Sequence, residues 1–399
     1  MSGSSATRRP GQKSRSRSAG RSLRSTTSKA RTRRRLHGHR TAPFVGLLTL
    51  VTILCLGGLV MVLSASSVAA LDELGDSYYF FKRQLLWLAI GAMAMVATMR
   101  IDYRTWRRFA LPVVVVAVLA LLLVLIPQIG ISVNGSRRWL GAGPFRVQPS
   151  ELAKLAVLLF SADLLARRGT LMDEAHLTIR PVLVVAVLLT GLVVIEDLGT
   201  GFVVMVTVLG VLWMAGAPAL QLGGVSLGFV AAGAALALYE PYRRARLTGF
   251  LNPWDDVRGT GWQTIQSLVG VASGGVFGVG LGASRAKWGF LPFAHTDFIF
   301  AVIAEELGLV GALTVVAMFL AVAFLGFRVA AQAPDRFGAL LAGGVTLWIL
   351  TQALVNIGGV LGLLPVTGVT LPFISSGGSS LVVTMAATGM LLSVARHAK

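Results

Sequence analysis

The sequence predicts an all-α polytopic membrane protein with about ten transmembrane helices. Hydrophobic residues make up 55% of the 399 residues and charged residues only 13%, and the mean hydropathy is +0.75. Apolar runs recur along the chain at close to the ~20 residues that a helix needs to cross a bilayer core of about 30 Å. A soluble protein of this length could not bury so much apolar surface, so soluble fold classes are excluded.

Residues 1–42 are predicted to form a disordered, basic tail in the cytoplasm. The first 40 residues hold 13 of the 36 Lys and Arg and no acid, and the rest of the chain has 23 basic and 17 acidic residues. A Ser/Arg-rich segment with so few apolar residues cannot build a core. The tail supplies most of the formal net charge of +19. We therefore expect this charge to bind anionic lipid or a cytoplasmic partner rather than nucleic acid.

Ten apolar runs divide residues 43–399, the predicted membrane domain. The basic tail fixes the N-terminus in the cytoplasm by the positive-inside rule, and ten crossings return the C-terminus to the same side. Residues 241–296, between the seventh and eighth runs, then form one large extracytoplasmic loop. The runs cover residues 43–66, 84–100, 109–127, 151–167, 181–196, 201–216, 221–240, 298–326, 338–361 and 380–395.

Nine basic residues fall on the predicted outer face, against the positive-inside rule. An anionic ligand at that face, such as a diphosphate, would compensate their charge. Long loops also cross a membrane largely regardless of charge, so both interpretations stay open. The nine residues are Arg137, Arg138, Arg146, Arg243, Arg244, Arg246, Arg258, Arg285 and Lys287.

Asp297 is the strongest candidate for a catalytic residue. It ends the polar outer loop and directly precedes the apolar run that begins at residue 298. A carboxylate at a membrane boundary is costly unless it has a function, and partial desolvation raises the pKa of a carboxyl toward the range of a general base. The structural alternative is that residues 295–297 cap the helix that follows.

Glu151 and Lys154 lie three residues apart on a helix predicted to begin at Pro149-Ser150, so they share a face and can form an ion pair. The pair is either a structural feature of the helix start, or Lys154 contacts the phosphates of a substrate. Arg137 and Arg138 are alternative phosphate ligands, because a guanidinium binds phosphate oxygens bidentately.

Residues 356–380 are rich in Gly and Pro and contain Ser375 and Ser376. This segment cannot form a continuous helix, and irregular backbone at membrane depth must line a cavity or be buried in protein. Its N–H groups and the two serine hydroxyls could hold an anion, or the segment could form a tight helix corner. The small residues of the stretch 343–362 are a candidate lipid-facing contact for a partner helix.

The glycines of the large loop include a match to the dinucleotide-binding fingerprint at Gly278, Gly280 and Ala283. That fingerprint requires a βαβ unit and an acidic residue farther along the chain, and neither is present. We interpret these glycines as flexible backbone in a substrate loop.

Four blocks of the sequence together resemble the SEDS family of membrane enzymes (shape, elongation, division and sporulation). Residues 60–67, 79–84 and 287–292 look most like its division branch. The resemblance implies a peptidoglycan glycosyltransferase that polymerises lipid II into glycan strands during septal cell-wall synthesis in the bacterial plasma membrane. The blocks, in the family's order, are Asn134–Lys154, Asn252–Gln263, Lys287–Gly308 and Asn356–Ser380.

The resemblance also implies roles for individual residues. Asp297 matches the family's essential acid, and Glu151 with Lys154 matches its helix-start ion pair. Phe293 stands where the division branch usually has Glu, a departure that leaves Asp297 intact. The substrate-binding candidates are Arg137, Arg138 and Arg246, which match outer-loop arginines of the family, together with Lys154, Lys287, Ser375 and Ser376, which are chosen for their charge, hydroxyl groups and position.

Neutralising the departing diphosphate requires positive charge near the acid. No metal-ligand set is evident, because the five histidines are scattered. Arginine and lysine side chains are the first candidates for this charge, and a divalent cation, Mg²⁺ or Mn²⁺, is the alternative.

A lipid II flippase, a non-catalytic scaffold and the elongation branch of the same polymerase family are the alternative functions. Only Glu305 and Glu306, within an apolar run, favour a transport path. The chain has no soluble domain that could house cross-linking chemistry. We therefore expect cross-linking to come from another chain. The family resemblance implies that this partner is a class B penicillin-binding protein, the septal transpeptidase, beside other membrane proteins of the division complex and membrane lipids.

Overall fold

The computed structural model describes residues 41–133, 136–142, 145–169, 178–195, 197–239 and 241–398. The predicted basic tail up to residue 40 and the predicted turn at Asn134-Gly135 lie outside the described residues. Each of the ten predicted apolar runs overlaps one helix. These helices are α1 (Ala42–Leu74), α2 (Tyr79–Arg100), α3 (Ala110–Leu125), α4 (Pro149–Arg167), α5 (Ile179–Val194), α6 (Leu198–Met214), α7 (Ala219–Tyr239), α10 (Ile299–Ala331), α11 (Arg336–Val360) and α12 (Ser379–Ala395).

Six helical segments in the described part of the chain are long and apolar enough to cross a membrane. They are α1, α2, the segment of 3-10 helix η1 (Tyr103–Phe109) and α3, and α7, α10 and α11. Helices α5, α6 and α12 are apolar but shorter, and α4 carries charged residues in its first and last turns. The multi-pass architecture agrees with the sequence, whereas the number of crossings stays a prediction.

Local sequence signals begin and end several of these helices. Thr41 caps α1, with the N–H of Phe44 donating to its hydroxyl, and Gly75 ends that helix in the left-handed conformation at φ 71°. Asp197 caps α6, accepting from the N–H of Thr200. Asp335 caps α11 in the same way. Each cap satisfies a backbone group that a helix end leaves without an intrahelical partner.

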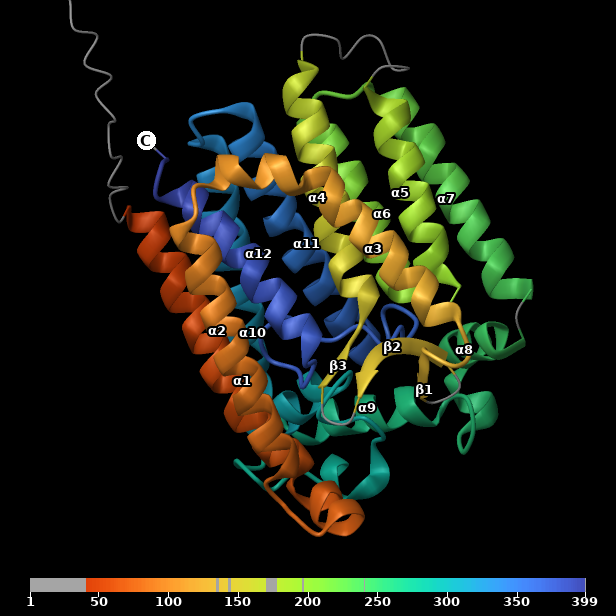
Figure 1. Cartoon of the computed structure of the whole chain (residues 1–399). Coiled ribbons are helices and arrows are strands. Elements are labelled where there is room, and N and C mark those ends of the chain that lie inside the picture. Colours follow the sequence, from red (N-terminus) through yellow and green to blue (C-terminus); the bar gives the residue numbers. More distant parts are fainter. Residues whose placement is uncertain are drawn as a thin grey trace, which may run out of the picture. The chain divides into compact units, whose positions relative to one another are not determined.

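Helices α11 and α12 form the centre of the bundle (Figure 1). Helix α12 packs along α2, and α11 contacts α10, α6 and α4. Trp348 of α11 is fully buried. Of the apolar window of α11, 78% is buried inside the protein, compared with 6% for α7. Helix α11 is therefore an interior helix, whereas α7 leaves most of its surface free for lipid.

The expectation that the small residues of 343–362 face lipid is wrong. A Cβ atom at Gly343 would lie 2.5 Å from Met214 Sδ, and one at Gly344 would lie 2.2 Å from Leu158 Cδ1. A Cβ atom at Gly358 would likewise lie 2.8 Å from Leu364 Cδ1. These glycines let α11 approach its neighbours inside the bundle, so they do not offer a surface to a partner helix.

The 241–296 segment is built from short helices and turns. It contains α8 (Pro241–Leu251), η3 (Pro253–Asp256), α9 (Trp262–Ser273) and the π-helical turn η4 (Ala286–Phe290). Its glycines pair with α10 where that helix is interrupted at Gly308, which has φ 67°. The N–H groups of Val279 and Gly280 donate to the carbonyls of Glu305 and Glu306.

The glycines of this loop are needed for that close approach. A Cβ atom at Gly278 would lie 2.1 Å from the Glu306 carbonyl oxygen, and one at Gly274 would lie 2.0 Å from that of Ala304. The interpretation of these glycines as flexible backbone is therefore wrong. They pack against α10 where that helix is interrupted at Gly308.

A three-stranded antiparallel sheet departs from the predicted all-α class. Its strands are β1 (Ile131–Val133), β2 (Ser136–Ala142) and β3 (Phe145–Val147), in the order β1-β2-β3. Leu140 pairs with Val147, and Ile131 with Trp139. Strands β1 and β3 have only three residues each, and the seven residues of β2, Ser-Arg-Arg-Trp-Leu-Gly-Ala, do not alternate between polar and apolar. The pattern that predicts a strand from sequence is therefore missing. The sheet holds Arg137 and Arg138 between α3 and α4.

Candidate functional site

Asp297 lies in the turn that precedes α10 and does not cap that helix. The N-cap position of α10 belongs to Phe298, and no side-chain hydrogen bond caps the helix. The Asp297 side chain is partly exposed. Its position is consequently set by other contacts, and its carboxylate is free to act on a ligand.

Three consecutive carbonyl groups hold the Asp297 turn against the segment 356–376. The N–H of Ser376 donates to the His295 oxygen at 3.0 Å, and Ser375 Oγ donates to the Thr296 oxygen at 2.7 Å. Asn356 Nδ2 donates to the Asp297 oxygen at 2.7 Å and to Val369 O at 2.8 Å. The predicted anion-binding groups Ser375 and Ser376 thus make hydrogen bonds that fix the acid's backbone.

Arg138, Arg246 and Asp197 surround the Asp297 carboxylate. A Cβ atom at Gly368, which has φ 79°, would lie 3.6 Å from Asp297 Oδ2 and 3.8 Å from Arg138 Nη1. Asp297 and Arg138 therefore flank this glycine. Arg138 lies 3.5 Å from Asp197 Oδ2, and Arg246 donates to Val366 O at 3.5 Å.

This surrounding perturbs the acid–base behaviour of Asp297. Although the residue is partly exposed, the surrounding protein removes water from its carboxyl, and this desolvation is the main reason why the pKa is raised to about 6. The negative charge of Asp197 raises the pKa further, with Arg246 and Arg138 opposing. Desolvation disfavours the charged carboxylate, which is why burial acts in this direction. A carboxyl with a pKa near 6 is a suitable general base close to neutral pH.

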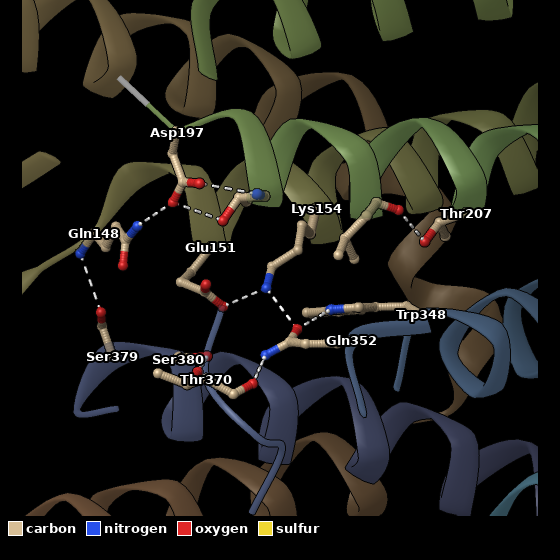
Figure 2. A network of polar contacts seen from close by, with 12 residues as sticks. Gln148, Glu151, Lys154, Asp197, Thr207, Trp348, Gln352, Thr370, Ser379 and Ser380 are labelled. Carbon is tan, nitrogen blue, oxygen red and sulfur yellow. Dashed lines mark hydrogen bonds and ion pairs between the residues drawn. The ribbon is translucent and has the colours of Figure 1, made fainter. Parts of the chain in front are cut away.

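Glu151 and Lys154 form the ion pair that their spacing allows (Figure 2). Lys154 Nζ lies 2.8 Å from Glu151 Oε2, and the side chains of Lys154 and Glu151 are only 3% and 5% exposed. The same ammonium donates to Gln352 Oε1 at 2.8 Å and lies 5.0 Å from the centre of the Trp348 ring. A contact between Lys154 and a substrate phosphate would require this enclosed network to open.

A second group of polar contacts surrounds Asp197, the N-cap residue of α6 (Figure 2). Gln148 Nε2 donates to Asp197 Oδ2 at 3.5 Å, and the Gln148 N–H donates to Ser379 Oγ at 3.0 Å. Sequence reasoning missed Asp197. The signal that could have found it is the one that selected Asp297, a carboxylate at the end of an apolar run.

The structure brings together only part of the predicted substrate-binding set. Arg138 and Arg246 lie with Asp297, and Arg137 precedes Arg138 on β2. Lys287 is not among the charged residues that act on Asp297. Lys287 instead lines a different cavity, close to α1.

The chain is similar to known proteins over most of its length. The family described as cell cycle protein, FTSW_RODA_SPOVE, matches residues 45–399. Stage V sporulation protein E of Bacillus subtilis (strain 168) is 44% identical over 368 residues, which cover 90% of this chain and 99% of that protein. A probable peptidoglycan glycosyltransferase FtsW of Thioalkalivibrio sulfidiphilus (strain HL-EbGR7) is 46% identical over 356 residues, covering 88% and 89%.

Solved structures agree with these relatives. A chain from a peptidoglycan synthase complex, studied for the structural coordination of polymerization and crosslinking, superposes with a TM-score of 0.71 at 33% identity, covering 88% of this chain and 97% of that one. The rod shape determining protein RodA of Thermus thermophilus gives a TM-score of 0.64 at 31% identity, covering 88% and 96%. The chain therefore belongs to the FTSW_RODA_SPOVE family of cell cycle proteins, as its four sequence blocks predict.

Proposed function

We propose that this chain is a peptidoglycan glycosyltransferase that polymerises lipid II in septal cell-wall synthesis. The observation that carries the proposal is a carboxylate with a raised pKa, fixed by its backbone and flanked by two arginines. Asp297 accepts the proton of the acceptor sugar hydroxyl as that oxygen attacks the anomeric carbon of the lipid-linked donor. The bond from this carbon to the diphosphate breaks, and inversion follows from a single displacement.

Arg138 and Arg246 stabilise the negative charge of the departing diphosphate. Positive groups placed in advance, where charge develops, lower the barrier without reorganising during the reaction. Among the described residues, no group of three or more His, Cys, Asp and Glu is suited to hold a metal ion. In this proposal the two arginines supply the positive charge, and Mg²⁺ or Mn²⁺ stays the alternative source of it.

Contacts of Glu305 and Glu306 favour the enzyme over a flippase. Glu305 accepts from Ser284 Oγ and from the N–H of Arg285, and Glu306 accepts from Ser64 Oγ at 2.7 Å. These carboxylates attach the outer loop to α1 and α10. Such contacts do not resemble the open polar path that transport of a charged head group requires.

Cross-linking of the product is assigned to a separate chain, a class B penicillin-binding protein. Ser284 and Lys287 have the Ser-x-x-Lys spacing of acyl-transfer enzymes. However, Ser284 is fully buried and bonded to Glu305, while Lys287 donates to the Gly282 carbonyl. That constellation is not assembled here. The known complex in which polymerization and crosslinking are coordinated supports a two-chain arrangement.

The proposed orientation has ten crossings, both termini in the cytoplasm and residues 241–296 outside. Single cysteines at positions 27 and 258, in a Cys55→Ala background, test it with a membrane-impermeant thiol reagent. We expect labelling only at position 258 in intact cells. Labelling at position 27 instead would reverse the orientation. Cys55 itself is buried, so its replacement mainly removes background.

The direct test of the proposed activity uses purified protein and fluorescent lipid II. We expect glycan strands to form, and to form faster when a class B penicillin-binding protein is added. A protein that moves lipid II across vesicles but never polymerises it would establish the flippase instead.

Asn356 offers a sharper test of how the site is organised. Its side chain is 4% exposed and ties the Asp297 carbonyl to Val369. Misplacing a reacting group by about 1 Å can cost ~10²-fold in rate. We expect Asn356→Ala to lower kcat for lipid II polymerisation by about that factor while KM changes little.

Ser267→Ala is the matched control for Asn356→Ala. Ser267 is also buried and donates to the Val360 carbonyl at 2.7 Å, so its loss weakens the same end of α11 without touching the Asp297 turn. Equal losses of kcat in both variants, at equal melting temperature, would show that Asn356 has no specific positioning role.

A further inference from the structure

A second cavity lies near the end of α1 and is separate from the Asp297 site. Its volume is about 370 Å³, and its walls come from α1 around Ser64, from the turn Ser77-Tyr78 and from Leu281 to Lys287. None of its lining residues lines the small space beside Asp297. A cavity of this size is within the ~300–1,000 Å³ typical of small-ligand sites.

Lys287 places a nearly enclosed ammonium in this cavity. The residue is 8% exposed, and Nζ donates to the Gly282 carbonyl. An ammonium has three donors, and within the described part of the chain no carboxylate forms an ion pair with Lys287. Burying a charge without an opposite charge is costly, so an anion would stabilise this arrangement.

The neighbouring acids are already engaged by other groups. Glu306 accepts from Ser64 Oγ at 2.7 and 2.8 Å and from the N–H of Ser284. Glu305 accepts from Ser284 Oγ and from the N–H of Arg285. These hydrogen bonds fix the walls on either side of Lys287, so the cavity is a built feature of the fold.

The remaining walls combine hydroxyl groups with exposed apolar side chains. Ser67 and Ser77 line the cavity, whereas Val60 and Leu281 in its wall are 52% and 62% exposed. A ligand that fits this pattern has a polar, anionic end and an apolar end.

The depth of the cavity points to the edge of the membrane. Ser64 lies 22 residues after Ala42, about 33 Å along α1 at 1.5 Å per residue, and the hydrocarbon core is about 30 Å thick. Tyr78 lines the cavity, and Trp288 and Phe290 follow Lys287 within three residues of the chain. All three are exposed, as expected of aromatic residues at a membrane interface.

We propose that the Lys287 cavity binds the phosphate head group of a lipid, with the apolar tail leaving past Val60 and Leu281. Lysine binds phosphate as a point charge, and the interface is the level at which lipid phosphates lie. The source of this phosphate is either a polyprenyl carrier lipid or a membrane phospholipid. The site is distinct from the arginines beside Asp297 and does not depend on the activity proposed there.

Binding to the full-length protein in detergent micelles tests this site. The probes are farnesyl phosphate, for the carrier lipids, and short-chain phosphatidylglycerol, for the phospholipids, with farnesol as the uncharged comparison. We expect Lys287→Gln to weaken binding of at least one phosphate probe by about tenfold or more, since hydrogen bonds to charged groups are the strong ones. Ser67→Leu, which fills the cavity with an apolar side chain, should weaken it as well.

Lys82→Gln is the matched control. Lys82 is 66% exposed and pairs with Asp76 at 3.0 Å, so it carries the same charge outside the cavity. It should leave the affinity of both probes unchanged. Asp297→Ala should also leave it unchanged, which separates this site from the proposed glycosyl transfer.

The two probes distinguish the sources of the phosphate. Binding of farnesyl phosphate alone identifies a carrier lipid, binding of phosphatidylglycerol alone identifies a membrane phospholipid, and binding of both identifies a general lipid-phosphate site. The proposal is overturned if folded Lys287→Gln protein, with an unchanged melting temperature, binds both phosphate probes as tightly as the parent does. It is overturned equally if farnesol binds as tightly as farnesyl phosphate, or if no probe binds.

Discussion

Asp297→Asn is expected to abolish polymerisation of lipid II while leaving the protein folded in the membrane. Asparagine keeps the shape of the side chain but cannot accept the proton of the acceptor hydroxyl. Positioned general-base catalysis is typically worth ~10²–10⁴-fold in rate. The backbone contacts that hold this turn, from Asn356, Ser375 and Ser376, do not involve the carboxylate, so the fold should survive.

Asp255→Asn serves as the control, because Asp255 is an exposed acid of the 241–296 segment, which ends directly before Asp297. It should keep the parent rate. Strand formation by well-expressed Asp297→Asn protein at the parent rate would remove Asp297 from the mechanism.

The pH dependence of the reaction follows from the same residue. A base acts only when deprotonated, and the pKa of Asp297 is raised to about 6. The rate of the parent protein should therefore fall as the pH drops below about 6, earlier than for an ordinary Asp with a pKa of about 3.9. An acid limb near pH 4 in kcat/KM would show that Asp297 is not the titrating base.

Lys154→Met is expected to destabilise the protein by about 3–5 kcal/mol, because it leaves the buried Glu151 carboxylate without its partner. It also removes a donor to Gln352 Oε1. The exposed pair Lys82–Asp76 provides the control, since such pairs contribute ~0–1 kcal/mol. Denaturation in detergent micelles should therefore show a large loss for Lys154→Met and little for Lys82→Met.

The double variant Glu151→Gln with Lys154→Met separates structure from substrate binding. Removing both charges relieves the buried, unpaired carboxylate, so we expect stability to recover in part. If this variant is folded and polymerises lipid II with an unchanged KM, Lys154 does not contact the substrate. Equal destabilisation by Lys154→Met and Lys82→Met would instead mean that the buried pair contributes no more than a surface pair.

The sequence by itself determined the helical framework of this protein. An apolar run of sufficient length has to form a helix in a bilayer, because its backbone groups find no other partner there. All ten predicted runs overlap helices for this reason. Asp297 and the Glu151–Lys154 pair could also be selected from sequence, the first by its place at the end of a polar loop, the second by a spacing that puts both side chains on one helix face.

Only the tertiary structure decided which surfaces and charges meet. From sequence alone, the glycines of 343–362 could form a stripe that faces lipid or one that faces the interior. Their contacts with Met214 and Leu158 show that the stripe faces the interior. Asp197 and Arg138 join Asp297, whereas Lys287, only ten residues away in the chain, faces another cavity. Asn356 reaches a carbonyl 59 residues away. Such pairings depend on how the helices pack, and local periodicity carries no information about contacts between residues far apart in the chain.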